Sequence, residues 1–303
     1  MTPAHRLGLR AAVSAGLLAG VALMVDTDRV MAHLQALSPG WVLAALALSV
    51  VQVALSAWRW RFTAARLGLE LPMAHAFREY YLGTFLNQVL PGGVLGDASR
   101  ALRHGRDSGS GRVALAAVAI ERGSGQVVMT LVAVPALVTL LTPVAPGLAW
   151  GSAAVVALAL LFGARLLPAE TGGTDPIASL RRALLAPDAL PLQLLSSSAV
   201  VATYLGVFMA AARGLGIELP PTILLPLVPP VLLAMLVPIT VAGWGLREGA
   251  AATVWATAGL EPAQGAAAAV AYGLLVLLGS LPGALGLLGG RSGRDRNSTK
   301  TRR

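Results

Sequence analysis

Long apolar stretches alternate with short polar segments along the chain, and this pattern predicts helices that cross a membrane. A helix that spans the hydrocarbon core of a bilayer needs about 17–25 predominantly apolar residues. Six stretches meet this length, at residues 9–25, 41–58, 113–141, 149–167, 191–212 and 264–288. A cleaved signal peptide is a rival interpretation of the first stretch, but its length favours a retained helix. The pattern predicts an all-α, polytopic helical membrane protein with six full spans.

Two further apolar segments, residues 80–90 and 222–237, are shorter than the spans. The first runs into Pro91 and the second into Pro238, and a glycine follows five residues after each proline. Proline removes a backbone donor and clashes with the preceding turn, so a straight helix is not expected through either place. We interpret both segments as halves of broken-helix hairpins.

The two broken segments occupy corresponding places in the two halves of the chain. The first lies between an inward-going and an outward-going span, and the second lies between spans of the reverse order. This is the arrangement of an inverted repeat, with two re-entrant hairpins that enter the membrane from opposite faces. Irregular backbone at membrane depth is tolerated where it lines a polar cavity, so such hairpins imply a cavity. Two alternatives stay open: ordinary surface turns, or hairpins that cross completely and give eight spans.

The composition agrees with a membrane protein, because 56% of the 303 residues are hydrophobic and only 12% are charged. The net charge of +9 is concentrated in residues 59–112, with eight arginines and four acids, and in residues 291–303, with six basic residues and one acid. Basic loops stay in the cytoplasm, which explains these segments better than nucleic-acid binding does. We expect a multi-pass cell-membrane protein with both termini cytoplasmic, a single transmembrane domain at 1–290 and a disordered tail at 291–303.

Two charged residues, Glu121 and Arg122, interrupt the apolar stretch at 113–141. A helix that enters the membrane at Arg112 would carry Glu121 about 13 Å deep, where an ionisable group has a functional role by default. Residues 123–141 are long enough to span alone, so an interfacial position is equally open. The chain has no cysteine, and its four histidines show no ligand spacing, so no metal site and no cofactor are expected.

Three separated motifs resemble the lysylphosphatidylglycerol synthase transmembrane, or flippase-like, family. They are FREYYLGTFLNQVLPGGVLGDASR at 77–100, AIERGSGQ at 119–126 and PITVAGWGLRE at 238–248. Their order and approximate spacing match those of the family, and WRW at 58–60 fits the end of an early span. The resemblance covers most of residues 40–290. The first motif reads GGVLGD where a tighter GGD-like run is typical of the family.

The resemblance implies a stand-alone lipid flippase-like module without the soluble synthase domain that follows it in fused members. It implies structural roles for Pro91 and Pro238. It implies that the substrate is bound by Asn87, Gly92, Gly96, Asp97, Arg100, Glu121, Arg122, Gly243, Gly245, Arg247 and Glu248. In this interpretation the three arginines contact a phosphate through their fork geometry. The three carboxylates orient the arginines, or they bind a cationic headgroup or a coupling proton.

The expected function is transport of a membrane lipid rather than catalysis. A charged headgroup that crosses the hydrocarbon unaided loses its solvation at a cost of many kcal/mol. An arginine-lined intramembrane cavity, together with backbone N–H groups at the broken helices, would replace water around the phosphate of a phospholipid or lipid-linked substrate. Two alternatives remain. One is an intramembrane enzyme acting on a polyprenyl or phospholipid substrate, although no paired acidic motif and no catalytic residue is found. The other is a non-transporting partner of a lipid-synthesising enzyme.

Overall fold

The computed structural model describes residues 37–90, 93–143, 186–235 and 240–289, together with a few positions between 147 and 184. These residues contain no strand, which confirms the all-α class for the described part of the chain. The helices are α3 (Pro39–Arg66), α4 (Met73–Val89), α5 (Leu95–Ser108), α6 (Gly111–Leu141), α9 (Leu190–Gly214), α10 (Pro221–Ala234), α11 (Leu246–Thr257), α12 (Pro262–Ser280), the 3₁₀ turn η2 (Leu281–Ala284) and α13 (Leu285–Gly289).

Four of the described helices are long and apolar enough to cross a membrane: α3, α6, α9, and α12 with its continuation to Leu287. They coincide with four of the six predicted spans. The predicted spans at 9–25 and 149–167 lie outside the described residues, apart from three positions in the second. The tail at 291–303 lies outside them too. The protein is therefore a helical membrane protein, and the count of six spans stays a prediction.

The first described helix, α3, continues past the predicted span end at residue 58 and reaches Arg66. No proline or glycine interrupts this stretch, and the helix ends just before Gly68, whose φ of 80° is left-handed. Arginine beside tryptophan is typical of a membrane interface, so the sequence pattern predicts too short a helix here. Arg59 is instead a buried member of the helix, with 3% of its surface exposed.

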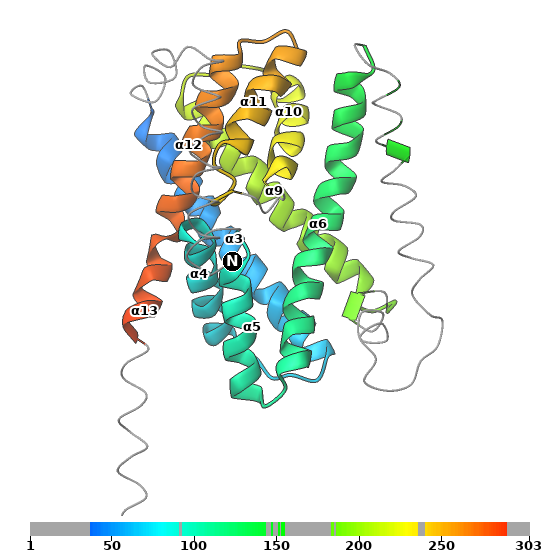
Figure 1. Ribbon diagram of the computed structural model, residues 1–303, viewed down its shortest axis with the longest axis vertical. Coiled ribbons are helices and arrows are strands. Elements are labelled where there is room, and N and C mark those ends of the chain that lie inside the picture. The colour runs from blue at the N-terminus through cyan, green and yellow to red at the C-terminus, as the bar shows by residue number, and fades with distance from the viewer. Residues whose placement is uncertain are drawn as a thin grey trace, which may run out of the picture.

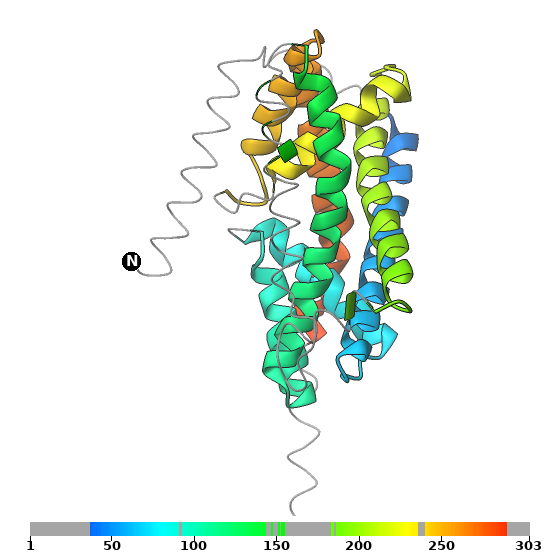
Figure 2. The ribbon, with the colours of Figure 1, turned by 90° about the vertical axis from the view of Figure 1, so that its right-hand side faces the viewer.

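Two short helical hairpins fill opposite ends of the bundle. Helix α4 packs against α5, and α10 packs against α11. Figure 1 shows the α4–α5 hairpin in the lower half and the α10–α11 hairpin in the upper half, with the ends of α4 and α10 and the starts of α5 and α11 directed toward the middle. The long helix α6 runs past both hairpins and contacts α5 and α10 (Figures 1 and 2).

Both predicted breaks are present, but the proline-rich segment is more helical than expected. Pro226, Pro229 and Pro230 lie inside α10, and the helix ends only at Ala234. Each internal proline removes one hydrogen bond, yet α10 is held by packing against α6, α9 and α11. Tertiary contact thus overrides the local preference of these prolines.

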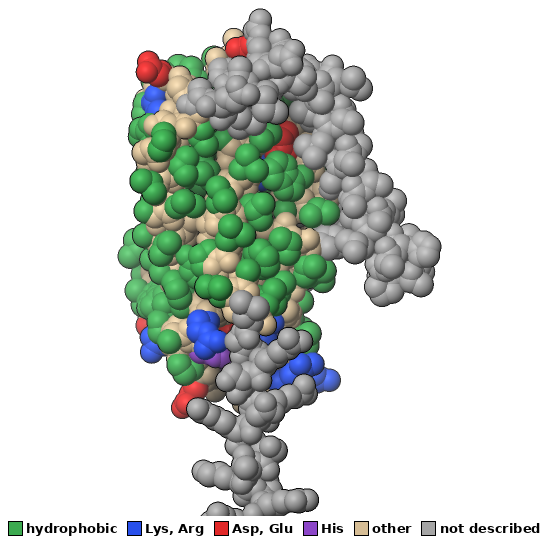
Figure 3. Space-filling view, turned by 90° about the vertical axis from the view of Figure 1, so that its left-hand side faces the viewer, with side chains coloured by type: hydrophobic (Ala, Val, Ile, Leu, Met, Phe, Trp, Pro, Cys, Tyr) green, Lys and Arg blue, Asp and Glu red, His purple; other side chains and the backbone are tan. Residues whose placement is uncertain are grey.

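Buried side chains form one core at each end of the bundle. At the α10–α11 end, Phe208 of α9 lies between Trp255 and Tyr272, with a centroid distance of 5.3 Å to Tyr272. At the other end, Trp60 and Tyr81 belong to a core of residues from α3 to α6. Figure 3 shows hydrophobic side chains over most of one flank, with the greater share of basic side chains at the lower end. This surface fits contact with lipid.

Candidate functional site

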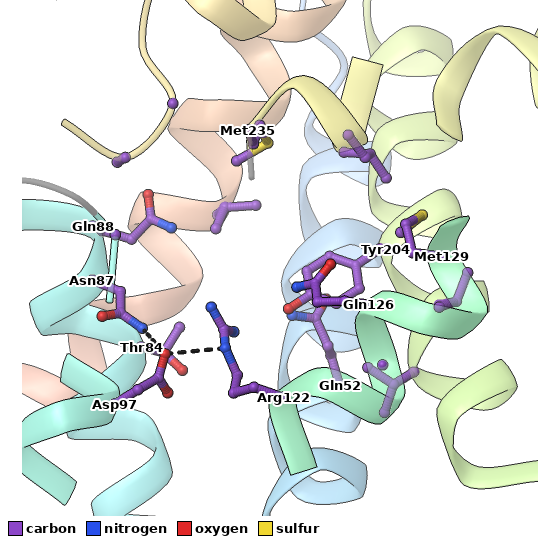
Figure 4. Close-up of a pocket in the computed structure, with 18 of the residues that line it drawn as sticks. Gln52, Thr84, Asn87, Gln88, Asp97, Arg122, Gln126, Met129, Tyr204 and Met235 are labelled. Carbon is purple, nitrogen blue, oxygen red and sulfur yellow. Dashed lines mark hydrogen bonds and ion pairs between the residues drawn. The ribbon is translucent and has the colours of Figure 1, made fainter. Parts of the chain in front are cut away.

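A cavity of about 170 Å³ lies where the two hairpin tips meet the long helices. Its walls include residues of α3, α4, α5, α6, α9, α10 and α12, and of the segment between α10 and α11. Figure 4 shows Arg122 near the centre, with Asp97 on one side and Gln126 on the other. The cavity is therefore built by the whole described bundle and not by a single hairpin.

A buried carboxylate, Glu121 on α6, lies behind the cavity wall and joins three helices. Its Oε1 accepts a hydrogen bond from Arg59 Nη2 of α3 at 2.5 Å, and its Oε2 accepts one from Arg100 Nη2 of α5 at 2.6 Å. The Tyr80 hydroxyl of α4 donates to Oε1 at 3.3 Å. Glu121 has no exposed surface, so each of these polar groups depends on the others for its partner.

Arg59 reaches Glu121 because the facing helix carries a glycine. Gly125 lies one turn after Glu121 on α6, and a Cβ there would lie 3.0 Å from Arg59 Nη2. Arg59 Nη1 also donates to the Ser197 hydroxyl of α9 at 3.1 Å. The absence of a side chain at Gly125 therefore leaves room for the guanidinium between α3, α6 and α9.

A second carboxylate, Asp97 at the start of α5, does face the cavity. Its Oδ1 accepts from Arg100 Nε at 3.0 Å, and its Oδ2 lies 3.1 Å from Arg122 Nε. Asn87, near the end of α4, donates to the same Oδ2 at 3.0 Å, and its own side-chain oxygen accepts the Gly96 N–H at 2.7 Å. Asn87 thus fixes the break of the first hairpin and the orientation of Asp97 together.

The two arginines bound to Asp97 differ in exposure. Arg100 is fully buried, with its guanidinium 4.7 Å from the Trp60 ring centroid and 4.4 Å from that of Tyr80. Arg122 keeps 32% of its side-chain surface exposed and uses only Nε toward Asp97. Among the described residues its two terminal nitrogens have no partner, and they point into the cavity (Figure 4). Arg122 is therefore the cation that a ligand in the cavity would meet first.

The second hairpin also contains a buried ion pair, but this pair lies away from the cavity. Arg247 Nη2 donates to Glu248 Oε1 at 2.5 Å, and Glu248 Oε2 accepts the Gly245 N–H at 2.6 Å. The guanidinium lies over the rings of Trp244 and Tyr272. A Cβ at Gly273 would occupy the space that this guanidinium fills. Arg247 is thus held between aromatic rings and a glycine of α12.

The segment that leads into α11 contributes backbone to the cavity. Ala242 and Gly243 line it, and both have positive φ angles, 51° and 80°. A positive φ is unfavourable for alanine, and such strain is frequent at functional sites. Residues 236–239 lie outside the described part of the chain.

The structure divides the residues predicted for the site into three groups. The cavity is lined by Asn87, Asp97, Arg122 and Gly243. Three lie behind its wall, Gly96 and Arg100 on α5 and Glu121 on α6. Three lie in the second hairpin away from the cavity: Gly245, Arg247 and Glu248. Pro91, Gly92 and Pro238 lie outside the described residues.

Of the three arginines expected to contact a phosphate, Arg122 lines this cavity, whereas Arg100 and Arg247 do not. Both are buried and paired with carboxylates, so they have no surface on the cavity. The N–H groups of Gly96 and Gly245 are not free, because the side chains of Asn87 and Glu248 accept hydrogen bonds from them. Glu121 lies within the length of α6 and is fully buried between helices.

Several cavity residues were missed by sequence reasoning. They are Gln52, Arg59, Tyr80, Thr84, Gln88, Gln126, Tyr204, Thr240 and Tyr272. A signal for some of them was present, because Gln52 and Arg59 are seven residues apart on α3, and Arg122 and Gln126 are four apart on α6. Residues at these spacings lie on one face of a helix. An arginine inside a long apolar helix is itself a sign of function.

The fold and the site together define a class: a helical membrane protein with a polar, arginine-bearing cavity between two broken hairpins. The family model described as the lysylphosphatidylglycerol synthase TM region matches residues 8–283. The chain therefore belongs to this family, which links it to the handling of membrane lipids. No curated protein and no solved structure matches the chain significantly.

Proposed function

We propose that the protein is a flippase-like transporter, not an enzyme, and that it binds the phosphate of a phospholipid or lipid-linked substrate in the cavity. The observation that carries the proposal is Arg122, whose terminal guanidinium nitrogens face a cavity lined in part by polar side chains. A guanidinium forms two parallel hydrogen bonds with a phosphate, and these are stronger in a site with little water. The cavity would thus replace the solvation that a headgroup loses inside the membrane.

The arrangement of the hairpins supports movement between leaflets. In this proposal the α4–α5 and α10–α11 hairpins are re-entrant, form an inverted repeat and enter the bilayer from opposite faces. The cavity lies between their tips, so small shifts of either hairpin would open it toward one side. Irregular backbone near residues 93 and 243 is then tolerated at the depth of the hydrocarbon core, because it lines a cavity with polar side chains.

The distribution of charge supports one orientation of the protein in the cell membrane. The loops and helix ends between α3 and α6 carry a set of arginines: Arg61, Arg66, Arg78, Arg103, Arg106 and Arg112. At the opposite end, the described loops next to α9, α10 and α11 carry Arg213, Glu218 and Glu261. Basic segments stay on the cytoplasmic side, so the α4–α5 hairpin would enter from the cytoplasm. Both termini are then cytoplasmic if six spans are present.

Leaflet exchange in vesicles tests the proposal. The purified chain is reconstituted in phosphatidylcholine vesicles with traces of acyl-labelled phospholipids, and a membrane-impermeant quencher measures exchange. Arg122→Gln should lower the rate at least about tenfold, since a charge-assisted bond to phosphate is lost. Folding should be retained, because Asp97 keeps Arg100 and Asn87 as partners.

Arg106→Gln is the matched control, because Arg106 is exposed on α5 and does not line the cavity. Its exchange rate should equal that of the unaltered protein. An equal rate in the Arg122→Gln variant would reject the assignment of Arg122. No exchange by the well-folded unaltered protein would instead favour a non-transporting partner of a lipid-synthesising enzyme.

A further inference from the structure

The charges around the cavity sum to one positive charge. Three arginines, Arg59, Arg100 and Arg122, stand against two carboxylates, Asp97 and Glu121. Arg59 Nε and Arg100 Nη1 are buried without a hydrogen-bond partner in the described structure, so donors are in excess. A ligand with one negative charge would neutralise this cluster.

Each oxygen of the two carboxylates already has a donor partner. Both oxygens of Glu121 accept from arginines, and both oxygens of Asp97 are bound to Arg100, Arg122 or Asn87. Asp97 is the one carboxylate among the described residues that line the cavity. An ammonium group there would be desolvated beside Arg122 and would have to compete with Arg100, Arg122 and Asn87 for Asp97, which is costly.

Uncharged polar side chains occupy much of the remaining wall. Gln52, Gln88 and Gln126 come from three helices, α3, α4 and α6, and none has a hydrogen-bond partner among the described residues. Figure 4 shows Gln88 on one side of the cavity and Gln52, Gln126 and Tyr204 on the other. An amide offers both donors and an acceptor, which matches a hydroxyl group that also does both. An apolar ligand would leave these amides unsatisfied at a cost.

We propose that the cavity selects headgroups that combine one phosphodiester with neutral hydroxyls and carry no amine. Arg122 takes the phosphate, and the three glutamines take the hydroxyls. This chemistry is shared by a glycerol headgroup on a diacyl lipid and by a sugar on a polyprenyl phosphate. The inference rests on the proposed function but narrows it, because a general phospholipid transporter would not need these amides.

Three labelled lipids in the vesicle assay separate the contribution of the hydroxyls from that of the missing amine. Phosphatidylglycerol has a phosphodiester and two hydroxyls, phosphatidylmethanol has the same charge without hydroxyls, and phosphatidylethanolamine has an amine. Phosphatidylglycerol should exchange at least about tenfold faster than phosphatidylethanolamine, and several-fold faster than phosphatidylmethanol. Equal rates for the three lipids, or a preference for the amine, would overturn the inference while leaving lipid transport intact.

A double variant tests whether the glutamine amides cause the preference for phosphatidylglycerol. Gln88→Leu/Gln126→Leu should bring the ratio of phosphatidylglycerol to phosphatidylmethanol exchange toward one. Gln264→Leu, at the start of α12 and outside the cavity, should keep the ratio of the unaltered protein. A full preference in the double variant would contradict the role of the glutamines.

A binding measurement keeps the inference testable if no lipid exchanges. In native mass spectrometry of the detergent-purified chain, phosphatidylglycerol and a polyprenyl phosphoryl hexose are each offered against phosphatidylethanolamine at equal concentration. Retention of either hydroxylated lipid over phosphatidylethanolamine supports the inference, and the better retained of the two identifies its source. Equal retention of all three would overturn it. If no lipid exchanges but a hydroxylated lipid is retained selectively, the transport proposal is rejected and the inference about the headgroup stands.

Discussion

The two hairpins each place a buried arginine near the start of their second helix, but the two arginines are neutralised differently. Arg100 of the α4–α5 hairpin pairs with Asp97 on its own helix and with Glu121 on α6. Arg247 of the α10–α11 hairpin pairs with Glu248, the next residue in the chain. The first hairpin is therefore tied electrostatically to the long helices, whereas the second carries its own counter-ion.

This difference separates the tasks of the two hairpins. The first contributes Asp97 and Asn87 to the cavity and shares its charge network with Arg59 and Arg122. The second contributes backbone at Ala242 and Gly243, and its ion pair is a local anchor between aromatic rings. A self-contained pair leaves the second hairpin free of ionic links to the cavity network. Changes that break each pair should therefore have unequal consequences.

The largest effect is expected from Glu121→Gln. The change removes the carboxylate charge that serves both Arg59 and Arg100, and it should cost about 3–5 kcal/mol, as for other broken buried ion pairs. Thermal unfolding in detergent should show a large loss of stability and a poor yield of folded protein. A melting temperature near that of the unaltered protein would show that the network is not needed for the fold.

A smaller loss of stability is expected in the second hairpin, and a second substitution should rescue it. Glu248→Leu leaves Arg247 unpaired and should cost about 3 kcal/mol, but Arg247→Met/Glu248→Leu should recover most of this stability. A loss of about 1 kcal/mol should remain, because Glu248 also accepts the Gly245 N–H. Thermal unfolding in detergent measures the stability of both variants.

The matched double variant for the first hairpin and α6 is Arg100→Met/Glu121→Leu. It should not recover the stability that is lost when Glu121 is replaced. Arg59 would still lack its counter-ion, and Asp97 would lose one of its arginines. Equal recovery in the two double variants would remove the distinction between a shared network and a local pair.

A third effect concerns the close packing inside the first hairpin. A Cβ at Gly96 would overlap the backbone carbonyl of Gly83, so Gly96→Ala should force α4 and α5 apart at a cost of about 1–3 kcal/mol. Gly123→Ala in α6 is the control, because a Cβ there meets no atom within 4 Å. The control should stabilise the helix by up to about 1 kcal/mol. Unchanged thermal stability in Gly96→Ala would contradict this close contact.

The smallest effect is expected at an exposed ion pair between α3 and the segment before α9. Arg66 Nη2 donates to Asp188 Oδ1 at 3.0 Å, and this hydrogen bond lowers the pKa of Asp188 below its usual value. The contribution to stability is therefore present above the pKa of the unfolded chain and is lost as the pH falls through the folded-state pKa. Asp188→Asn should lower the melting temperature slightly at neutral pH and not at all in strong acid. A difference that grows toward acid pH would contradict this sign.

Much of the helical framework follows from local sequence. Apolar length predicts α3, α6, α9 and α12, because each must bury its backbone polar groups within itself. The breaks after α4 and α10 follow from proline and glycine. The sequence pattern places the end of α3 too early, because arginine near tryptophan is typical of an interface. Only the packing of α6 and α9 around Arg59 shows that this arginine is in the interior of the bundle.

The sequence by itself determined the class, the broken hairpins and most of the ionisable residues at the centre. The tertiary structure alone decided which of these face the cavity: Arg122 does, whereas Arg100, only three residues from Asp97, is turned onto Trp60 and Tyr80. The physical reason is that a buried charge is oriented by its nearest counter-ion. For Arg59 and Arg100 that counter-ion, Glu121, is 62 and 21 residues away in the chain.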